Sequence, residues 1–237
     1  MQSHNPIIVA LDVPEATAAE NLARTVSPHV GAVKIGSELF TAAGPDVVRR
    51  LRQTGAAVFL DLKFHDIPNT VAKAVANAVR LDVQMLTIHT SGGVEMMRAA
   101  ETAAQDTARS LGRPAPLVLG VTVLTSMNSA QLATVTLESD VARQVERLAR
   151  LAAEAGLRGL VCSPLELGPL RRVLPPEVQL VTPGIRTTPP GPGDDQKRTL
   201  GPAEALEAGA NWLVIGRPIY AAADPAAAAQ SLLALTR

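Results

Sequence analysis

Eight short runs rich in apolar and β-branched residues recur along the chain, and helix-like segments separate them. The runs are IIVALDV, VGAVKIG, AAVFLDLK, MLTIHT, PLVLGVTVLT, LRGLVCS, VQLVTPGI and NWLVIGR, and they begin at positions 7, 30, 56, 85, 116, 157, 178 and 211. Nearly all are continuously apolar rather than alternating, which is typical of parallel strands covered on both faces. The sequence therefore predicts a parallel sheet with helices packed around it.

Helical segments lie between these runs. After the third run, apolar residues recur at helical spacing at positions 71, 74, 75, 78 and 79, which predicts one buried helix face. Pro68 suits the first turn of that helix, with Asp66 or Ile67 near its cap. The segments ESDVARQVERLARLAAEAG and GPAEALEAGA have the same pattern, and each includes a glycine, Gly156 or Gly209, where helices commonly end.

Eight strands alternating with helices in 237 residues match the number and size of a (β/α)8 barrel, the TIM barrel of the α/β class. An open doubly wound sheet is the alternative. Against it, no Gly-x-Gly-x-x-Gly turn follows the first strand, where the sequence reads DVPEATAAENLA. The chain shows no linker, low-complexity segment or repeat of fixed period. We therefore expect a single domain over residues 1–237.

The charges balance, with 22 Lys and Arg against 22 Asp and Glu. This balance predicts no broad surface for nucleic acid or anionic membrane, so a site for an anion must be local. The lone Cys162 excludes an internal disulfide and disfavours a thiolate metal site. The chain begins without a leader-like pattern, and no apolar run approaches the ~18 residues of a membrane span. We expect a cytoplasmic protein.

Polar and charged residues follow most of the predicted strands. In a (β/α)8 barrel the C-terminal strand ends form the functional face. These ends carry Asp12, Lys34, Asp61 with Lys63, His89, Thr125, Ser163, Gly184 with Arg186, and Gly216 with Arg217. Because strand side chains alternate, Asp61 and Lys63 share one face with Phe59, and the two neighbouring leucines share the other. If the leucines face the helices, both charges point into the barrel mouth, where Lys34 joins them.

A structural ion pair would explain Asp61 and Lys63 taken alone, since buried charges must be paired whatever they do. A whole cluster of charged groups at one rim is harder to explain by structure. Each group is costly to desolvate, and replacing such pairs by apolar residues is often neutral or stabilising. Function is therefore the better interpretation of the cluster.

Two other chemistries are open to residues near this cluster. A Schiff-base nucleophile needs a neutral amine, whereas two nearby carboxylates favour the ammonium form of Lys63. His65 and His89 are possible metal ligands, but neither has a second His or Cys at ligand spacing. The pattern favours a Lys63 that donates a proton or provides a fixed positive charge, and no metal.

The last two predicted strands end in a different pattern. PGIR, at 183–186, and IGRPI, at 215–219, each place a glycine beside an arginine. Exposed backbone N–H groups and a guanidinium are the donors that a phosphate requires, and barrels commonly bind phosphate after strands seven and eight. A long loop rich in Pro and Gly, TPGIRTTPPGPGDDQKRTLGP, joins these strands, and loops of that length usually have a function.

These motifs resemble the orotidine 5′-phosphate decarboxylase family. LDLKFHDIPNT is similar to that family's Asp-x-Lys-x-x-Asp signature, and VALDV, VKIGSELF, VTVLTS, VTPGIR, DDQ and VIGRPI resemble its other motifs in the expected order. The resemblance covers nearly the whole chain. It implies a barrel that decarboxylates orotidine 5′-phosphate to UMP as a homodimer with shared active sites, and that needs no cofactor and no metal.

The resemblance also implies roles for particular residues. An alternating charge network around the pyrimidine C6 carboxylate would consist of Lys34, Asp61, Lys63 and Asp66. Lys63 would be the proton donor. The implied substrate-binding residues are Asp12 at the ribose hydroxyls, Thr70 from the neighbouring subunit, Thr125 at the pyrimidine, Arg186, Arg217 and the Gly216 backbone at the phosphate, Gln196 from the long loop, and Pro183.

Two alternatives remain open. Related sugar-phosphate barrels, such as 3-keto-gulonate 6-phosphate decarboxylase and hexulose phosphate synthase, also have Asp-x-Lys-x-x-Asp but use Mg²⁺. They are expected to have an acidic ligand at the second strand, where this chain has Lys34, a cation that repels the metal. The other alternative is a non-catalytic barrel that binds a phosphorylated nucleotide. It would need no proton donor, so the complete set of Asp61, Lys63 and Asp66 disfavours it.

Overall fold

The computed structural model describes residues 5–186 and 199–236. Its parallel strands close into a barrel in chain order, and β1 pairs with β8 through Ile8 and Val214. The strands are β1 Ile7–Ala10, β2 Ala32–Gly36, β3 Val58–Phe64, β4 Met85–His89, β5 Leu117–Val121, β6 Gly159–Val161, β7 Gln179–Thr182 and β8 Trp212–Ile215. This confirms the (β/α)8 barrel and excludes the open sheet, which would have two unpaired edges.

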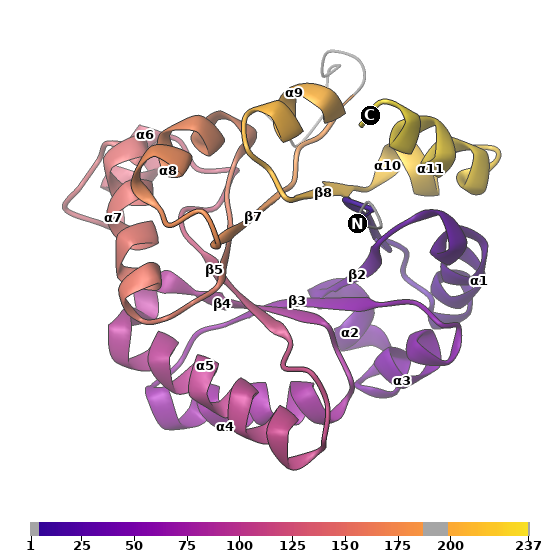
Figure 1. Cartoon of the computed structure of the whole chain (residues 1–237), viewed down its shortest axis with the longest axis horizontal. Coiled ribbons are helices and arrows are strands. Elements are labelled where there is room, and N and C mark those ends of the chain that lie inside the picture. Colours follow the sequence, from indigo (N-terminus) through magenta and orange to yellow (C-terminus); the bar gives the residue numbers. More distant parts are fainter. Residues whose placement is uncertain (1–4, 187–198, 237) are drawn as a thin grey trace.

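The helices lie outside the ring of strands (Figure 1). They are α1 Ala16–Val26, α2 Ser37–Ala43, α3 Asp46–Gln53, α4 Pro68–Arg80, α5 Gly93–Ser110, α6 Ser129–Ala133, α7 Val141–Glu154, α8 Leu167–Val173, α9 Pro202–Glu207, α10 Arg217–Tyr220 and α11 Pro225–Ala234. Short 3₁₀ turns span Ser27–His29, Thr90–Gly92 and Pro164–Glu166. In the described ranges, none of the helices is both long and apolar enough to cross a membrane.

The predicted helical segments correspond to α4, α7 and α9. Helix α4 begins at Pro68 with Ile67 at the cap, and it buries Val71 and Val75 against the barrel. Gly156 and Gly209 follow α7 and α9 with φ of +88° and +109°. These turns favour glycine because it adopts a left-handed backbone without the steric cost of a Cβ.

The apolar core has two layers, which follow from the alternation of side chains along each strand. The inner layer fills the barrel and includes Ile8, Phe59 and Leu119. The outer layer lies between barrel and helices, and it includes Leu60 with Leu62 packed against it. The leucines of β3 therefore face the helices, which directs the opposite face of this strand into the barrel.

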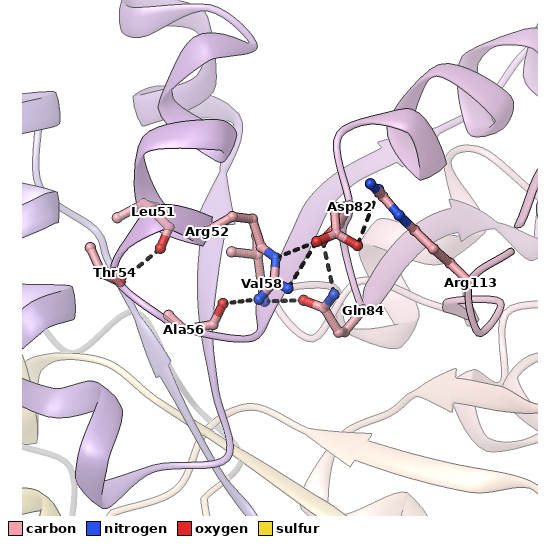
Figure 2. Close-up of polar contacts among 8 residues, drawn as sticks. All are labelled: Leu51, Arg52, Thr54, Ala56, Val58, Asp82, Gln84 and Arg113. Atoms are coloured by element: carbon pink, nitrogen blue, oxygen red, sulfur yellow. Dashed lines mark hydrogen bonds and ion pairs between the residues drawn. The ribbon is translucent and has the colours of Figure 1, made fainter. Parts of the chain in front are cut away.

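A polar network ties the N-terminal ends of β3, β4 and β5 together (Figure 2). Arg52 of α3 donates to Asp82 Oδ2 from Nε at 3.1 Å and from Nη2 at 2.9 Å, and it also donates to the Ala56 carbonyl. Arg113 lies 3.5 Å from the other Asp82 oxygen. Gln84 accepts the Val58 N–H at 2.8 Å. Because this network lies opposite the C-terminal strand ends, we assign it to stability.

Replacing Arg52 by alanine is expected to lower the free energy of unfolding by about 1–2 kcal/mol, since charge-assisted hydrogen bonds are lost at a partly exposed site. Urea denaturation measures the change. The matched control is Arg49→Ala on the same helix, whose pair with Asp46 is 3.9 Å long and more than half exposed. We expect the control to change stability by less than about 0.5 kcal/mol. Equal losses in both variants would contradict the assignment.

Candidate active site

A cavity of about 690 Å³ opens at the C-terminal ends of the strands. This volume lies within the range of small-molecule sites in proteins. Its lining combines an apolar floor with charged groups at the rim, and consists of Ala10, Asp12, Lys34, Glu38, Phe59, Asp61, Lys63, Val121, Val123, Leu124, Thr125, Val161, Pro183, Gly184, Arg186, Val214, Gly216, Arg217 and Tyr220. The cavity thus draws residues from most of the barrel.

Four charged side chains form a chain of alternating sign along one wall. Lys34 Nζ lies 3.2 Å from Asp12 Oδ1 and 3.9 Å from Asp61 Oδ2. Lys63 Nζ lies 2.8 Å from Asp61 Oδ1. The Lys34 and Asp61 side chains are only 11% and 16% exposed, so these charges interact in an environment that screens them poorly. Each charge is compensated by a neighbour of opposite sign.

The backbone of Lys63 is unusual. Its φ is +52°, in the left-handed region that non-glycine residues rarely adopt. The pairing of β3 with β4 shifts register between Leu60 and Phe64, so Lys63 lies in an irregular segment of the strand. Such outliers occur where function constrains the backbone. The alternation argument predicts the direction of the Asp61 side chain but not this irregularity.

Two loops at the rim of the cavity, after β7 and β8, carry the Gly and Arg residues predicted to bind phosphate. Pro183, Gly184 and Arg186 follow β7, and Gly184 has a φ of +80°. Arg186 donates from Nη1 to the Ile185 carbonyl at 3.0 Å. Arg217 begins α10 directly after β8 and also lines the cavity. Because β8 pairs with β1, this cationic side of the cavity adjoins the Asp12 end of the charged wall.

Two predicted site residues lie outside this cavity, and one lies outside the described residues. Asp66 and Thr70 are exposed at the start of α4, and the Asp66 carboxylate accepts the Ile67 N–H at 2.6 Å. Asp66 does not pair with Lys63 within the chain. Gln196 is among the residues that the structure does not describe. The four-residue network predicted from the sequence is thus present here without its Asp66 member.

Known proteins with similar sequences place this chain in a family. The family described as "Orotidine 5′-phosphate decarboxylase / HUMPS family" matches residues 5–232. The chain belongs to this family. It is 51% identical over 235 residues to orotidine 5′-phosphate decarboxylase of Moorella thermoacetica, covering 99% of this chain and 93% of that protein. It is 54% identical to that of Opitutus terrae, covering 96% of each.

Solved structures give the same result. The crystal structure of orotidine 5′-phosphate decarboxylase from Lactobacillus acidophilus is similar with a TM-score of 0.86 and 36% sequence identity. The match covers 98% of this chain and 99% of that one. The resemblance seen in the sequence motifs is therefore confirmed over nearly the full length, and membership of the decarboxylase family rests on both sequence and fold.

Sequence reasoning missed several residues that line or support this cavity. Thr87 of β4 is fully buried, and its hydroxyl donates to Asp61 Oδ1 at 2.9 Å. Its position, two residues from Met85 and from His89, places it on the inner face of the strand by simple alternation. Glu38 and Tyr220 also line the cavity. They occur in helices that begin directly after strands, and no spacing in the sequence marks them.

Three further titratable groups, His65, His89 and Cys162, lie outside the charged wall. Burial lowers the pKa of His89, and the nearby charges of His65 and Lys63 lower it further, which outweighs the opposing effect of Asp61. The His65 and His89 rings lie 5.5 Å apart between centroids. Burial raises the pKa of the Cys162 thiol to about 12, which keeps it protonated. Within 5–186 and 199–236, no three His, Cys, Asp or Glu side chains gather as metal ligands.

Proposed function

We propose that this chain decarboxylates orotidine 5′-phosphate to UMP without a metal or a cofactor. The observation that carries the proposal is the contact of Lys63 with Asp61 at 2.8 Å, next to Lys34, in a cavity that Arg186 and Arg217 also line. The curated relatives that are about half identical over nearly the full chain carry this activity in their names. The geometry of the site and the sequence similarity thus support the same reaction.

The chemistry explains the need for the charged wall. Loss of CO₂ breaks the bond from C6 to the carboxylate carbon and leaves the electron pair on C6, in the ring plane, where no π system delocalises it. A positive charge must therefore already be in place. The Lys63 ammonium supplies that charge, then transfers a proton to C6 to give UMP, and its neutral amine regains a proton from water. The balance requires no electron acceptor.

Asp61 contributes in two ways. It holds the Lys63 ammonium through the 2.8 Å contact, which reduces the reorganisation needed when charge develops at C6. It would also lie close to the departing carboxylate, and the repulsion between the two anions is relieved as CO₂ leaves. Lys34, 3.9 Å from Asp61 Oδ2, offsets part of that negative charge.

The other lining residues are assigned to binding. Arg186, Arg217 and the Gly216 backbone would hold the phosphate, while Asp12 would bind the ribose hydroxyls. Thr125 and Pro183 would contact the nucleotide from the rims after β5 and β7. Gln196 stays a prediction for the phosphate. Contacts made far from C6 can be used to position the reacting carbon against Lys63.

Replacing Arg217 by alanine should weaken binding of the nucleotide by roughly 1.5–3 kcal/mol, about 10- to 150-fold, through lost charge-assisted hydrogen bonds. Steady-state kinetics with orotidine 5′-phosphate measure the effect. Orotidine, which lacks the phosphate, is the control substrate, and both proteins should act on it equally. If Arg217→Ala impairs the two substrates to the same extent, Arg217 does not bind the phosphate.

A homodimer with shared sites is part of the proposal. Asp66 and Thr70 are exposed at the start of α4, and Ile67 between them is 65% exposed. A partner subunit would cover this segment and receive Asp66 and Thr70 in its own cavity. The cytoplasmic location and the lack of a nucleic-acid partner stay predictions.

The sugar-phosphate alternative fits the site less well. A Mg²⁺ ion prefers several oxygen ligands, but Lys34 already lies within 4 Å of the carboxylates of Asp12 and Asp61. A metal there would meet a fixed cation. A non-catalytic barrel would have no use for an ammonium held against a carboxylate beside the cavity. Decarboxylation is the function that gives a role to all four charged side chains of this wall.

The proposal is tested by mixing EDTA-treated protein with orotidine 5′-phosphate and following the pyrimidine absorbance. We expect conversion at the same rate with and without EDTA. Unchanged absorbance would refute the proposal. Activity that is lost with EDTA and restored by Mg²⁺ would instead favour metal-dependent chemistry of the sugar-phosphate barrels.

A further inference from the structure

Strands β3 and β4 do not pair evenly next to the charged wall. The ladder pairs Leu60 with Leu86 and next pairs Phe64 with Ile88. Three residues of β3 therefore lie opposite one residue of β4, Thr87. Residues inside such a bulge lose their regular ladder partners, so their polar groups must find others.

The Thr87 hydroxyl supplies those partners. It accepts the backbone N–H of Lys63 at 2.9 Å and donates to Asp61 Oδ1 at 2.9 Å. Thr87 is fully buried, so water does not compete for either bond. One hydroxyl thus connects the left-handed backbone of Lys63 to the carboxylate that its own side chain contacts.

This connection fixes the orientation of the Asp61 carboxylate. Oδ1 receives two hydrogen bonds, from Lys63 Nζ and from Thr87, so rotation of the carboxylate would break both. Oδ2 is then directed to Lys34, 3.9 Å away. Without the hydroxyl, the carboxylate would be free to turn and Lys63 would lose a backbone restraint at a strained position.

We propose that Thr87 is a positioning residue, which holds Asp61 and Lys63 in reactive alignment through its hydroxyl and does not touch the substrate. The inference rests on the proposed decarboxylation. It predicts a loss in kcat rather than in substrate binding, because the phosphate and ribose contacts lie on other strands.

The test compares Thr87→Val, which keeps the shape but removes the hydroxyl, with Thr87→Ser, which keeps the hydroxyl. We expect Thr87→Val to lower kcat about 10- to 100-fold, as for loss of a hydrogen bond to a charged group, with KM changed less than about threefold. Thr87→Ser should retain kcat within about threefold. If Thr87→Val does not fold, Thr87→Ala takes its place with the same expectation.

Thr90→Val is the matched control. Thr90 is equally buried, and its hydroxyl donates to the Val121 carbonyl at 2.9 Å, away from the charged wall. We expect this variant to lose stability but to keep kcat. Wild-type kcat in Thr87→Val, or equal losses in the valine and serine variants, would overturn the inference alone. An inactive wild-type protein in the same series would refute the proposed function, and the inference with it.

Discussion

Lys63→Ala is expected to abolish turnover of orotidine 5′-phosphate while leaving the fold intact. The variant removes both the charge that stabilises the C6 carbanion and the acid that protonates it. General acid catalysis and charge stabilisation together predict a loss of about 10⁴-fold or more in kcat. The Lys63 side chain is 35% exposed and belongs to neither apolar layer, so its truncation opens no core cavity. Kinetics and circular dichroism measure the two effects.

A matched control uses another lysine. Lys73 is exposed on α4, and Lys73→Ala is expected to keep wild-type kcat. A Lys63→Ala protein that retains near-native kcat would show that the proton donor is misassigned. An unfolded Lys63→Ala protein would contradict the second half of the expectation, since the lysine would then be needed for folding.

Mixing Lys63→Ala with Asp66→Asn should recover activity from two inactive proteins. Asp66 is exposed and does not contact Lys63 in its own chain, as expected if it completes the partner's charge network. In a mixed dimer, one site would then have both defects and the other would be wild type. Random exchange makes about half of the dimers mixed, each with one good site of two. About a quarter of all sites should therefore recover.

The control for mixing pairs Lys63→Ala with Asp61→Asn. Lys63 and Asp61 are in contact at 2.8 Å within one chain, so every site of that mixed dimer keeps one defect and no activity should return. Subunit exchange is checked independently by mass spectrometry of tagged chains. If Lys63→Ala with Asp66→Asn also recovers nothing although exchange is complete, Asp66 does not act across a subunit interface.

The sequence predicts the fold well because each strand coincides with a clear run of apolar residues. Strands buried on both faces give continuous apolar runs, and each of the eight runs overlaps a strand of the barrel. The facing of Asp61 also follows from alternation, since Phe59 packs inside and Leu60 outside. Charges at the ends of such strands are conspicuous, and they mark the rim of the cavity.

The details of the site are not contained in the same signals. No residue type in DLKF marks the left-handed backbone of Lys63, which depends on the uneven pairing with a distant strand. Thr87 occurs within an apolar run, and threonine is common in strands, so its type does not indicate a role at the site. Asp66 does not line the cavity of its own chain, so the role proposed for it would depend on a partner subunit. The backbone of Lys63 and the position of Thr87 arise from tertiary contacts rather than from local pattern.

The most direct test of the central claim is the reaction of the EDTA-treated protein with orotidine 5′-phosphate in D₂O, followed by proton NMR of the product. Decarboxylation with protonation by Lys63, whose ammonium exchanges with solvent, predicts UMP that carries deuterium at C6 and one CO₂ released per UMP formed. The Lys63→Ala protein should form no detectable UMP. Recovery of unchanged orotidine 5′-phosphate from the wild-type reaction would contradict the account.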